Sequence, residues 1–398
     1  MMKKRIAIIT AAAMIAVAAA GCSGLFMSRV LAAENNMTED GLHFLDDSNL
    51  GKSNLKIALL TSPTGTDDLA VNRGLKQGLS EFLETDKTAS FKEFSEKTGK
   101  PDACLKMAEE LAADYDVVVT SGEMFSGITD VAKKCKDTKF ILFDAVPLDQ
   151  KGNPVVLDNV TSFTYRDEES GFLAGIAAAL ESKSGKVAAV TAAGAASKDE
   201  KAGTAANSKS KTGSSPVNGA DPGNVAANGK LGFACGVNYA NKNLGTSVKV
   251  PVSDNEMTAK QLIAEGCDVL YPASPKCAKE VLRAAKAAKG VRVIGAFIDL
   301  FPYGGNAKDN VVITSVYRTQ DSDLLAELLT IALENAVGEN KESGTYDYSI
   351  NYYFDTERSQ LSDRTDTVLM EVFDMLWQKK VVPASLTNGM SADQFTGL

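Results

Sequence analysis

The sequence contains a single histidine, His43, among its 398 residues. Serine–histidine triads, histidine-rich zinc sites and acid–base chemistry by an imidazole all need this side chain. The motif GxSxG is absent, and neither GxxxxGK[ST] nor GxGxxG follows a predicted strand. The sequence therefore disfavours hydrolases and phosphate-binding loops, and we expect no enzymatic activity, no metal and no cofactor.

Positive charge is also scarce. Lys and Arg number 42 against 51 Asp and Glu, which gives a formal net charge of −9. No cluster of cations compensates for this excess, so phosphate backbones repel the chain. We expect no nucleic-acid partner.

Long apolar runs are confined to the N-terminus, where residues 6–20 are uncharged and follow Lys3, Lys4 and Arg5. This run is shorter than the roughly 20 residues that a membrane-spanning helix needs. Together with the small residues before Cys22 it predicts a lipoprotein signal peptide over residues 1–21. We expect acylation of Cys22, a lipidated tether over 22–52, and anchoring to the extracytoplasmic face of the cell membrane.

Five cysteines remain beyond Cys22, an odd number without CxxC spacing, which favours small buried residues over a disulfide framework or a metal site. Cys267 with Cys277 is the pair to test first. The adjacent carboxylates of Asp67 and Asp68, and those of residues 167–169, could hold a metal. Their positions before predicted helices favour a role at helix N-termini, where acidic side chains are stabilised.

From Leu55 onward, short β-branched runs alternate with helical patterns. This alternation predicts parallel sheets covered by helices on both faces. Two such series of similar size predict two α/β lobes with a cleft between them. The expected strands lie at 55–61, 115–120, 139–145, 159–165, 185–191, 247–252, 267–272, 291–297, 310–317 and 346–354.

Residues 192–230 interrupt the pattern, because they are rich in Ala, Gly, Ser and Asn and contain no aromatic residue. Such a segment buries too little apolar surface to offset its ordering entropy. We expect a flexible insertion in the second lobe.

Several segments carry a family resemblance, among them KIALLTSPTGTDDLAVNRGLKQGL, NVTSFTYRDEESGFLAG, GFACGVNYAN, GCDVLYP and VVITSVYRTQD. The chain resembles the basic membrane protein family of bacterial lipoproteins, purine-nucleoside receptors of ABC importers, from about Leu55 to about Leu376. The resemblance implies a type I periplasmic-binding fold, in which two doubly wound parallel-sheet lobes joined by three crossings close on a ligand. The expected N-terminal lobe is 53–162 plus about 300–340, and the C-terminal lobe is 163–299 plus about 341–398.

The resemblance also implies a ligand site, whose predicted members are Thr61, Ser62, Asp67, Asp68, Val71, Asp144, Tyr165, Phe297, Asp299 and Arg318. Asp144 and Arg318 match the family's acidic and basic positions, and Asp299 keeps the second Asp of the family's GVDxDQ segment. Tyr165 offers an aromatic face to a ligand.

Three positions depart from the family pattern. Ser62 follows Thr61 where the family has Asp, Val71 replaces an aromatic residue, and Phe297 replaces the Asp that accepts ribose hydroxyls. Unpaired ligand groups cost about 1 to 3 kcal/mol each, so either the ligand differs from an ordinary nucleoside or other residues take over.

The resemblance therefore predicts a solute-binding lipoprotein that delivers a small ligand, a nucleoside or a related compound, to an ABC permease. A sensor or adhesion lipoprotein that retains the fold with an altered ligand site is the alternative. A nucleoside hydrolase has little support, because no activating base is visible.

Overall fold

The computed structural model describes residues 52–61, 63, 65–191, 225–251, 257–306, 308–337, 345–348, 351–352 and 358–377. The predicted signal peptide, Cys22, nearly all of the tether, Ser62 and most of the 192–230 segment lie outside these residues. No helix within the described ranges is long and apolar enough to cross a membrane.

The first sheet has six parallel strands in the order β10-β5-β4-β3-β1-β2. Its inner strands are continuous apolar runs, as expected where helices cover both faces. The strands are β1 Lys56–Thr61, β2 Ser90–Ser95, β3 Val117–Ser121, β4 Lys139–Phe143, β5 Val160–Tyr165 and β10 Thr345–Tyr348.

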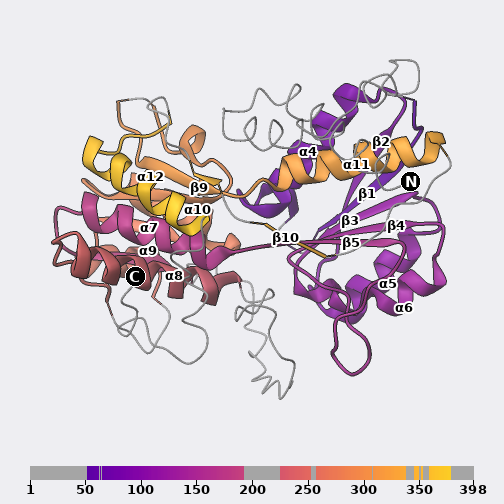
Figure 1. The fold of residues 1–398 in the computed structure, drawn as a ribbon, viewed down its shortest axis with the longest axis horizontal. Coiled ribbons are helices and arrows are strands. Elements are labelled where there is room, and N and C mark those ends of the chain that lie inside the picture. The colour runs from indigo at the N-terminus through magenta and orange to yellow at the C-terminus, as the bar shows by residue number, and fades with distance from the viewer. Residues whose placement is uncertain are drawn as a thin grey trace.

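Alternate residues of these strands enter different cores. Ile57 and Leu59 of β1 join the core beneath helices α4 (Val71–Thr85) and α11 (Gln320–Val337). Ala58 and Leu60 join the core beneath α5 (Pro101–Leu111) and the short α6 (Thr129–Lys134). Figure 1 shows α4 and α11 together on one side of the sheet and α5 and α6 on the other.

The second sheet has five strands in the order β11-β9-β8-β7-β6, and only β11 is antiparallel to its neighbour. Helices α7, α8 and α12 share one core with it, and α9 and α10 share the other. The strands are β6 Val187–Val190, β7 Val269–Pro272, β8 Arg292–Phe297, β9 Val312–Tyr317 and β11 Asn351–Tyr352. The helices are α7 Asp167–Glu181, α8 Val225–Asn243, α9 Ala259–Ala264, α10 Ala278–Lys286 and α12 Asp363–Trp377.

The described chain passes between the two sheets three times: after β5, after β9, and between β10 and β11. The expected lobe boundaries near residues 300 and 340 are wrong for two strands. Strand β9 belongs to the second sheet and β10 to the first. The apolar pattern of a segment indicates that it is a strand, but it does not indicate which of the two sheets the strand joins. The two strands were therefore assigned to the wrong lobes.

Two further expectations need correction. Residues 225–230, assigned to the insertion, form the first turns of α8. A strand was expected over residues 247–252; of these, the described residues 247–251 contribute only an isolated bridge between Lys249 and Lys186.

Helices α7 and α8 approach each other through glycines. A Cβ on Gly171 or Gly175 of α7 would meet backbone oxygen atoms of α8, and a Cβ on Gly232 or Gly236 would meet those of α7. Four glycines thus remove the side chains that would hold the two backbones apart. This close packing fixes the N-terminal turn of α7, where Asp167 lies.

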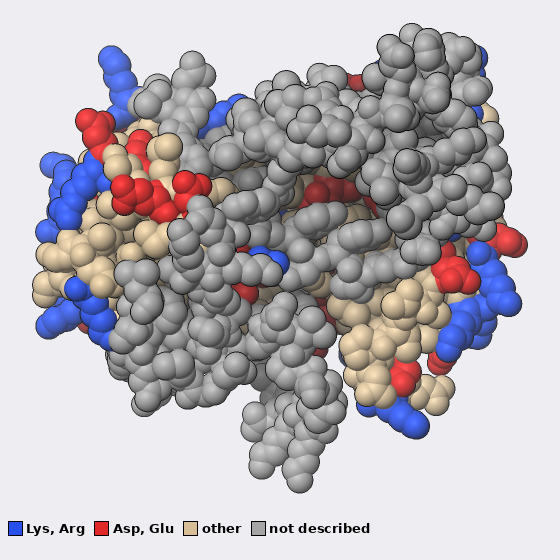
Figure 2. Space-filling model, viewed as in Figure 1, with Lys and Arg blue, Asp and Glu red and all other residues tan. Residues whose placement is uncertain are grey.

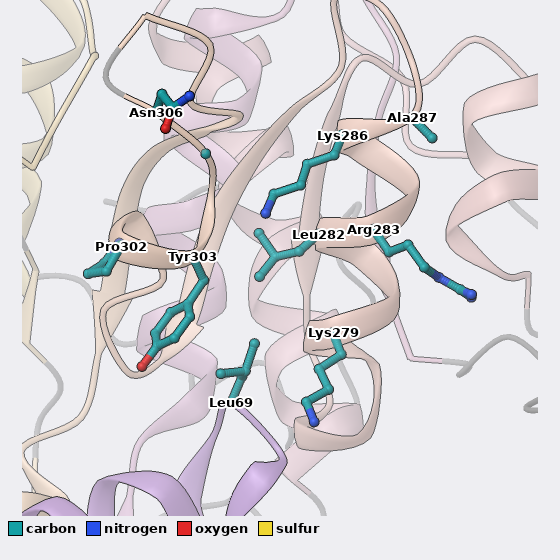
Figure 3. A pocket seen from close by; sticks show the side chains of 10 residues that line it. Leu69, Lys279, Leu282, Arg283, Lys286, Ala287, Pro302, Tyr303 and Asn306 are labelled. Carbon is teal, nitrogen blue, oxygen red and sulfur yellow. The ribbon is translucent and has the colours of Figure 1, made fainter.

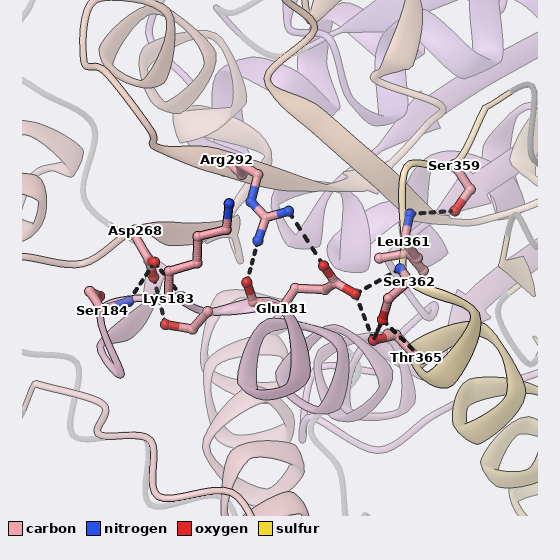
Figure 4. Close-up of polar contacts among 10 residues, drawn as sticks. Glu181, Lys183, Ser184, Asp268, Arg292, Ser359, Leu361, Ser362 and Thr365 are labelled. Atoms are coloured by element: carbon pink, nitrogen blue, oxygen red, sulfur yellow. Dashed lines mark hydrogen bonds and ion pairs between the residues drawn. The ribbon is translucent and has the colours of Figure 1, made fainter.

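Glu181, the last residue of α7, ties α12 to the second lobe (Figure 4). Its carboxylate accepts hydrogen bonds from the Ser362 N–H at 2.8 Å and the Thr365 hydroxyl at 2.7 Å. It also pairs with Arg292 of β8 at 3.4 Å. Because Glu181 and Arg292 are mostly buried, this contact anchors the start of α12.

All five cysteines beyond Cys22 are free thiols, so Cys267 and Cys277 are not joined. Burial raises the pKa of Cys104 and of Cys267 to about 11, and that of Cys235 to about 12.

Candidate functional site

The carboxyl ends of β4, β5, β8 and β9 meet where the two sheets face each other. Asp144 follows β4, Tyr165 ends β5, Phe297 ends β8 and Arg318 follows β9. All four side chains are buried. Figure 2 shows acidic side chains recessed between the two halves of the molecule on the face in view. The structure thus brings together four of the ten predicted site residues, two from each series of strands.

Arg318 is the centre of this group. Its Nη1 donates to both carboxylate oxygens of Asp144 at 2.8 Å. Its Nη2 donates to both oxygens of Asp167 at 2.6 Å, and its Nε donates to one of them at 3.0 Å. The planar guanidinium is thereby shared between two carboxylates, an arrangement that suits its fork of donors.

The Arg318–Asp167 pair joins two of the passages between the lobes. Asp167 begins α7 directly after the chain leaves the first sheet, and Arg318 lies where the chain leaves the second. Asp144 adds a third anchor from the end of β4. Movement of one lobe against the other therefore acts on this ion cluster.

Two aromatic rings contact the same guanidinium. Its carbon lies 4.9 Å from the ring centroid of Tyr165 and 5.0 Å from that of Phe297. Cation–π attraction is stronger in such a desolvated setting than at an exposed surface. The rings and the carboxylates together make an environment suited to a flat polar group.

The backbone is strained at two of these residues. Asp144 has φ 56° and Phe297 has φ 70°, in the left-handed region that non-glycine residues seldom adopt. Such conformations cost of order 1 to 3 kcal/mol and persist where surrounding contacts over-determine them. The Phe297 carbonyl accepts from the Gln320 amide at 3.0 Å, and the Asp144 N–H donates to the Phe163 carbonyl at 2.9 Å.

Burial also sets the protonation of the cluster. It raises the pKa of the Asp167 carboxyl to about 6; the Arg318 cation acts against this rise and the Asp144 charge adds to it. Burial alone would lower the pKa of Arg318, but the carboxylates of Asp144 and Asp167 raise it well above its usual value. Arg318 therefore stays charged, and the Asp167 carboxyl takes up a proton at a higher pH than an ordinary aspartate.

A further carboxylate, that of Asp323, holds the Tyr165 side chain in place. The Tyr165 hydroxyl donates to Asp323 at 2.6 Å, and the Thr319 hydroxyl donates to the same oxygen at 2.9 Å. Burial, with the nearby Asp323 charge, raises the pKa of Tyr165 well above its usual value. Tyr165 is therefore a fixed hydrogen-bond donor at neutral pH.

Five predicted residues lie outside the cluster. Asp68 accepts hydrogen bonds from the N–H groups of Ala70, Asn72 and Arg73, which are typical contacts of a helix cap. Asp67 is 84% exposed and lies 3.8 Å from Arg73. These contacts agree with the role at a helix N-terminus that the sequence favours for both residues.

The remaining three are also engaged elsewhere. The Thr61 hydroxyl donates to the Phe94 carbonyl of β2 at 3.0 Å, and Val71 is buried in the first-lobe core. Asp299 pairs with Arg358 at 2.6 Å. Ser62 lies outside the described residues.

Sequence reasoning overlooked Asp167 as a site residue. Acidic residues at a helix start are common for electrostatic reasons, so its run with Glu168 and Glu169 carried no distinct signal. The signal that could have found it is the basic residue Arg318, which needs a buried carboxylate partner.

The lobes also meet at a second place. The Arg73 Nε of α4 donates to the Tyr303 hydroxyl at 2.9 Å, and its guanidinium lies 5.2 Å from the Tyr303 ring centroid. Tyr303 belongs to the short turn Phe301–Tyr303 after β8. Leu69, with φ 55°, packs against the second-lobe core beside it.

Two lobes with parallel sheets, crossed three times by the chain, with a polar and aromatic cluster at the seam, define a type I periplasmic solute-binding fold. A solute-binding protein of an ABC transporter system from Conexibacter woesei DSM 14684 has this fold, with a TM-score of 0.56 at 18% identity over 82% of this chain and 98% of that one.

Residues 55–351 match the family described as ABC transporter substrate-binding protein PnrA-like. The chain belongs to this family, which confirms the resemblance found in the sequence. A CD4+ T-cell-stimulating antigen of Listeria monocytogenes is 23% identical over 356 residues, 83% of this chain and 87% of that protein. An ABC transporter nucleoside-binding protein BmpA of Lactococcus lactis is 28% identical over 139 residues, 34% of this chain and 38% of that protein.

Proposed function

We propose that this protein captures a nucleoside or a related small solute between its lobes and delivers it to an ABC permease, without making or breaking a covalent bond. Membership of the substrate-binding family supports the delivery role. The similarity to a protein named for nucleoside binding supports the solute class.

One observation carries the proposal: the chain holds two carboxylates, a guanidinium and two aromatic rings together at the seam between the lobes. A nucleoside has a flat base that stacks on rings and ribose hydroxyls that donate to carboxylates. The buried Asp144 and Asp167 provide the acceptors, and Tyr165 and Phe297 provide the ring faces.

Arg318 competes with the solute for these groups. In the structure the Arg318 guanidinium pairs with both carboxylates and contacts both aromatic rings. A nucleoside therefore binds by drawing at least one carboxylate away from Arg318. Such an exchange would couple binding to a shift between open and closed lobe arrangements, because Arg318 and Asp167 lie in different passages of the chain.

The protein would act outside the cytoplasm, held by a lipid on Cys22 after removal of residues 1–21. The predicted signal peptide supports this location. The mass of the mature N-terminal peptide tests it, and Cys22→Ala should release the protein from the membrane fraction.

A sensor or adhesion lipoprotein that keeps the fold is the second candidate. The observation in its favour is the same ion cluster, in which Arg318 already satisfies Asp144 and Asp167. In that case the cluster would serve as a permanent bond between the lobes.

A thermal-shift panel of purine and pyrimidine nucleosides, free bases and ribose separates these functions. A receptor gains about 2.7 kcal/mol at a ligand concentration one hundred times the Kd. We expect a rise in Tm with at least one nucleoside, retained in Arg166→Ala and lost in Asp144→Asn. No shift with any compound would favour the sensor or adhesion function, and new products in chromatography would indicate an enzyme.

A further inference from the structure

A basic groove lies outside the ligand cluster, between helix α10 and the turn that carries Tyr303 (Figure 3). Its volume is about 840 Å³. Nine of its lining residues belong to the second lobe and one, Leu69, belongs to the first. The lining residues are Leu69, Lys279, Leu282, Arg283, Lys286, Ala287, Pro302, Tyr303, Gly305 and Asn306.

The charge of this groove is opposite to that of the chain. Lys279, Arg283 and Lys286 are exposed, none of the described residues that line the groove is a carboxylate, and the chain as a whole carries −9. Within the described part of the chain, none of these three cations forms a salt bridge. Figure 3 shows Lys286 reaching toward the gap that faces Tyr303. Lys279 borders the lower end of the groove near Leu69, and Arg283 points away from it. The Lys286 ammonium group thus overhangs the groove, and Lys279 lines its lower end.

The other lining side chains are largely apolar. Leu282, midway along α10, is buried and faces the groove. Pro302 and Tyr303 form the opposite wall, and Leu69 closes one end. An occupant therefore needs anionic groups for the lysines and an apolar group for the wall.

The groove depends on contact between the lobes. Leu69 comes from the first lobe and is held at φ 55°. Arg73 lies in the first turn of α4, close to Leu69, and its Nε donates to the Tyr303 hydroxyl at 2.9 Å. Opening of the lobes would remove Leu69 and Arg73 from Tyr303 and leave the groove incomplete.

We propose that this groove docks an acidic segment of a partner protein, one that places carboxylates against Lys279 and Lys286 and an apolar side chain against Leu69 and Tyr303. Charge complementarity selects the partner's chemistry. An open groove with one charged bank and one apolar wall fits an extended chain better than a flat bilayer. The docking of an acidic segment does not depend on the proposed function. The further inference that docking reports solute-induced closure of the lobes rests on the proposed function.

Fluorescence anisotropy with the full chain tests the docking. The probes are a panel of labelled peptides that alternate Asp or Glu with Leu, and matched peptides carrying Asn and Gln instead. We expect binding of the acidic peptides only, weakened as salt rises. The double variant Lys279→Glu/Lys286→Glu should weaken it at least tenfold.

The matched control is Lys87→Glu/Lys97→Glu, which changes the net charge equally at exposed sites of the first lobe away from the groove. Equal loss in both double variants would overturn the proposal, because it would show a general charge effect. Binding of phosphatidylglycerol vesicles that depends on Lys279 and Lys286, without peptide binding, would overturn it in favour of a membrane surface. Competition by pyrophosphate at peptide-like concentrations would reveal a small-anion site instead and also overturn it.

Tyr303→Phe tests the dependence on lobe contact, since it removes the acceptor of the Arg73 hydrogen bond while keeping the ring. We expect peptide binding to fall several-fold with the fold retained. A nucleoside Tm shift without peptide binding would refute the docking proposal alone. Peptide binding without any nucleoside shift would refute the proposed solute and leave the docking intact.

Discussion

Strands β5 and β9 are each second from the edge of their sheet. Each ends in a tyrosine followed directly by an arginine, Tyr165-Arg166 in one and Tyr317-Arg318 in the other. The two arginines differ in their surroundings. The Arg166 side chain is 27% exposed and pairs with Glu169 of its own helix at 3.3 Å. The Arg318 side chain is 1% exposed and pairs with Asp144 and Asp167, both far away in sequence.

The same Tyr-Arg dipeptide thus gives a local ion pair at the start of a helix in one lobe and an ion pair between the lobes in the other. Burial makes the difference: solvent still reaches the Arg166 guanidinium, whereas the Arg318 cation is fully buried and its removal leaves two uncompensated charges. Four substitutions test this difference in burial.

Arg318→Ala should have the largest effect. It leaves the buried Asp144 and Asp167 without a cation, so we expect the free energy of unfolding to fall by about 3 to 5 kcal/mol. Urea denaturation followed by circular dichroism measures this loss. Methylguanidinium should raise the Tm of this variant more than that of the wild type; equal shifts would show that no site for a guanidinium was vacated.

Asp167→Asn should change how stability depends on pH. Because burial raises the pKa of Asp167 to about 6 in the folded state, the folded protein binds a proton more tightly than the unfolded chain, where the value is about 3.9. The Asp167 contribution is therefore full below about pH 4 and is lost as the pH rises toward 6, by roughly 2 to 3 kcal/mol. The difference between wild type and variant across this range measures it, and Asp130→Asn, at an exposed position of the first lobe, is the matched control.

Tyr165→Phe should cost less, about 1 to 3 kcal/mol, because it removes one donor from Asp323 while the ring stays against Arg318. The half-buried Tyr115, outside the cluster, provides Tyr115→Phe as the matched control. Identical unfolding midpoints for the two variants would contradict the support role of the Tyr165 hydroxyl.

Arg166→Ala should have the smallest effect, below about 1 kcal/mol, because its pair with Glu169 is local and partly exposed. The same urea titration applies. A loss as large as that of Arg318→Ala would remove the distinction between the two strand ends.

Much of the fold could be predicted from the sequence, because buried parallel strands are continuous apolar runs. Strands β1, β3, β4 and β5 lie where these runs are. Strand β2, with the sequence SFKEFS, was missed because it lies at the sheet edge and is mostly polar. Residues 346–354 were expected as one strand but contribute to both sheets. The alternation of side chains continues through this segment, so the sequence does not mark the point where the chain crosses from one lobe to the other.

The site was less predictable. Asp144 and Arg318 were identified through the family pattern, and burial of each requires the other. Asp299 and Asp68 were also predicted, but nearer partners hold them: Arg358 for one and helix N–H groups for the other. Which carboxylate faces a distant cation is decided by three-dimensional packing, and local sequence does not record it.

The buried free thiols make the protein a reporter of its own unfolding. The reactive form of cysteine is the thiolate, and the pKa of Cys104, Cys235 and Cys267 is raised to about 11, 12 and 11 in the folded state. A thiol reagent at neutral pH would therefore modify these three residues only as fast as the chain around each one opens. Two of them lie in the second lobe and one in the first, so mass spectrometry of the labelled peptides would time the opening of each lobe separately.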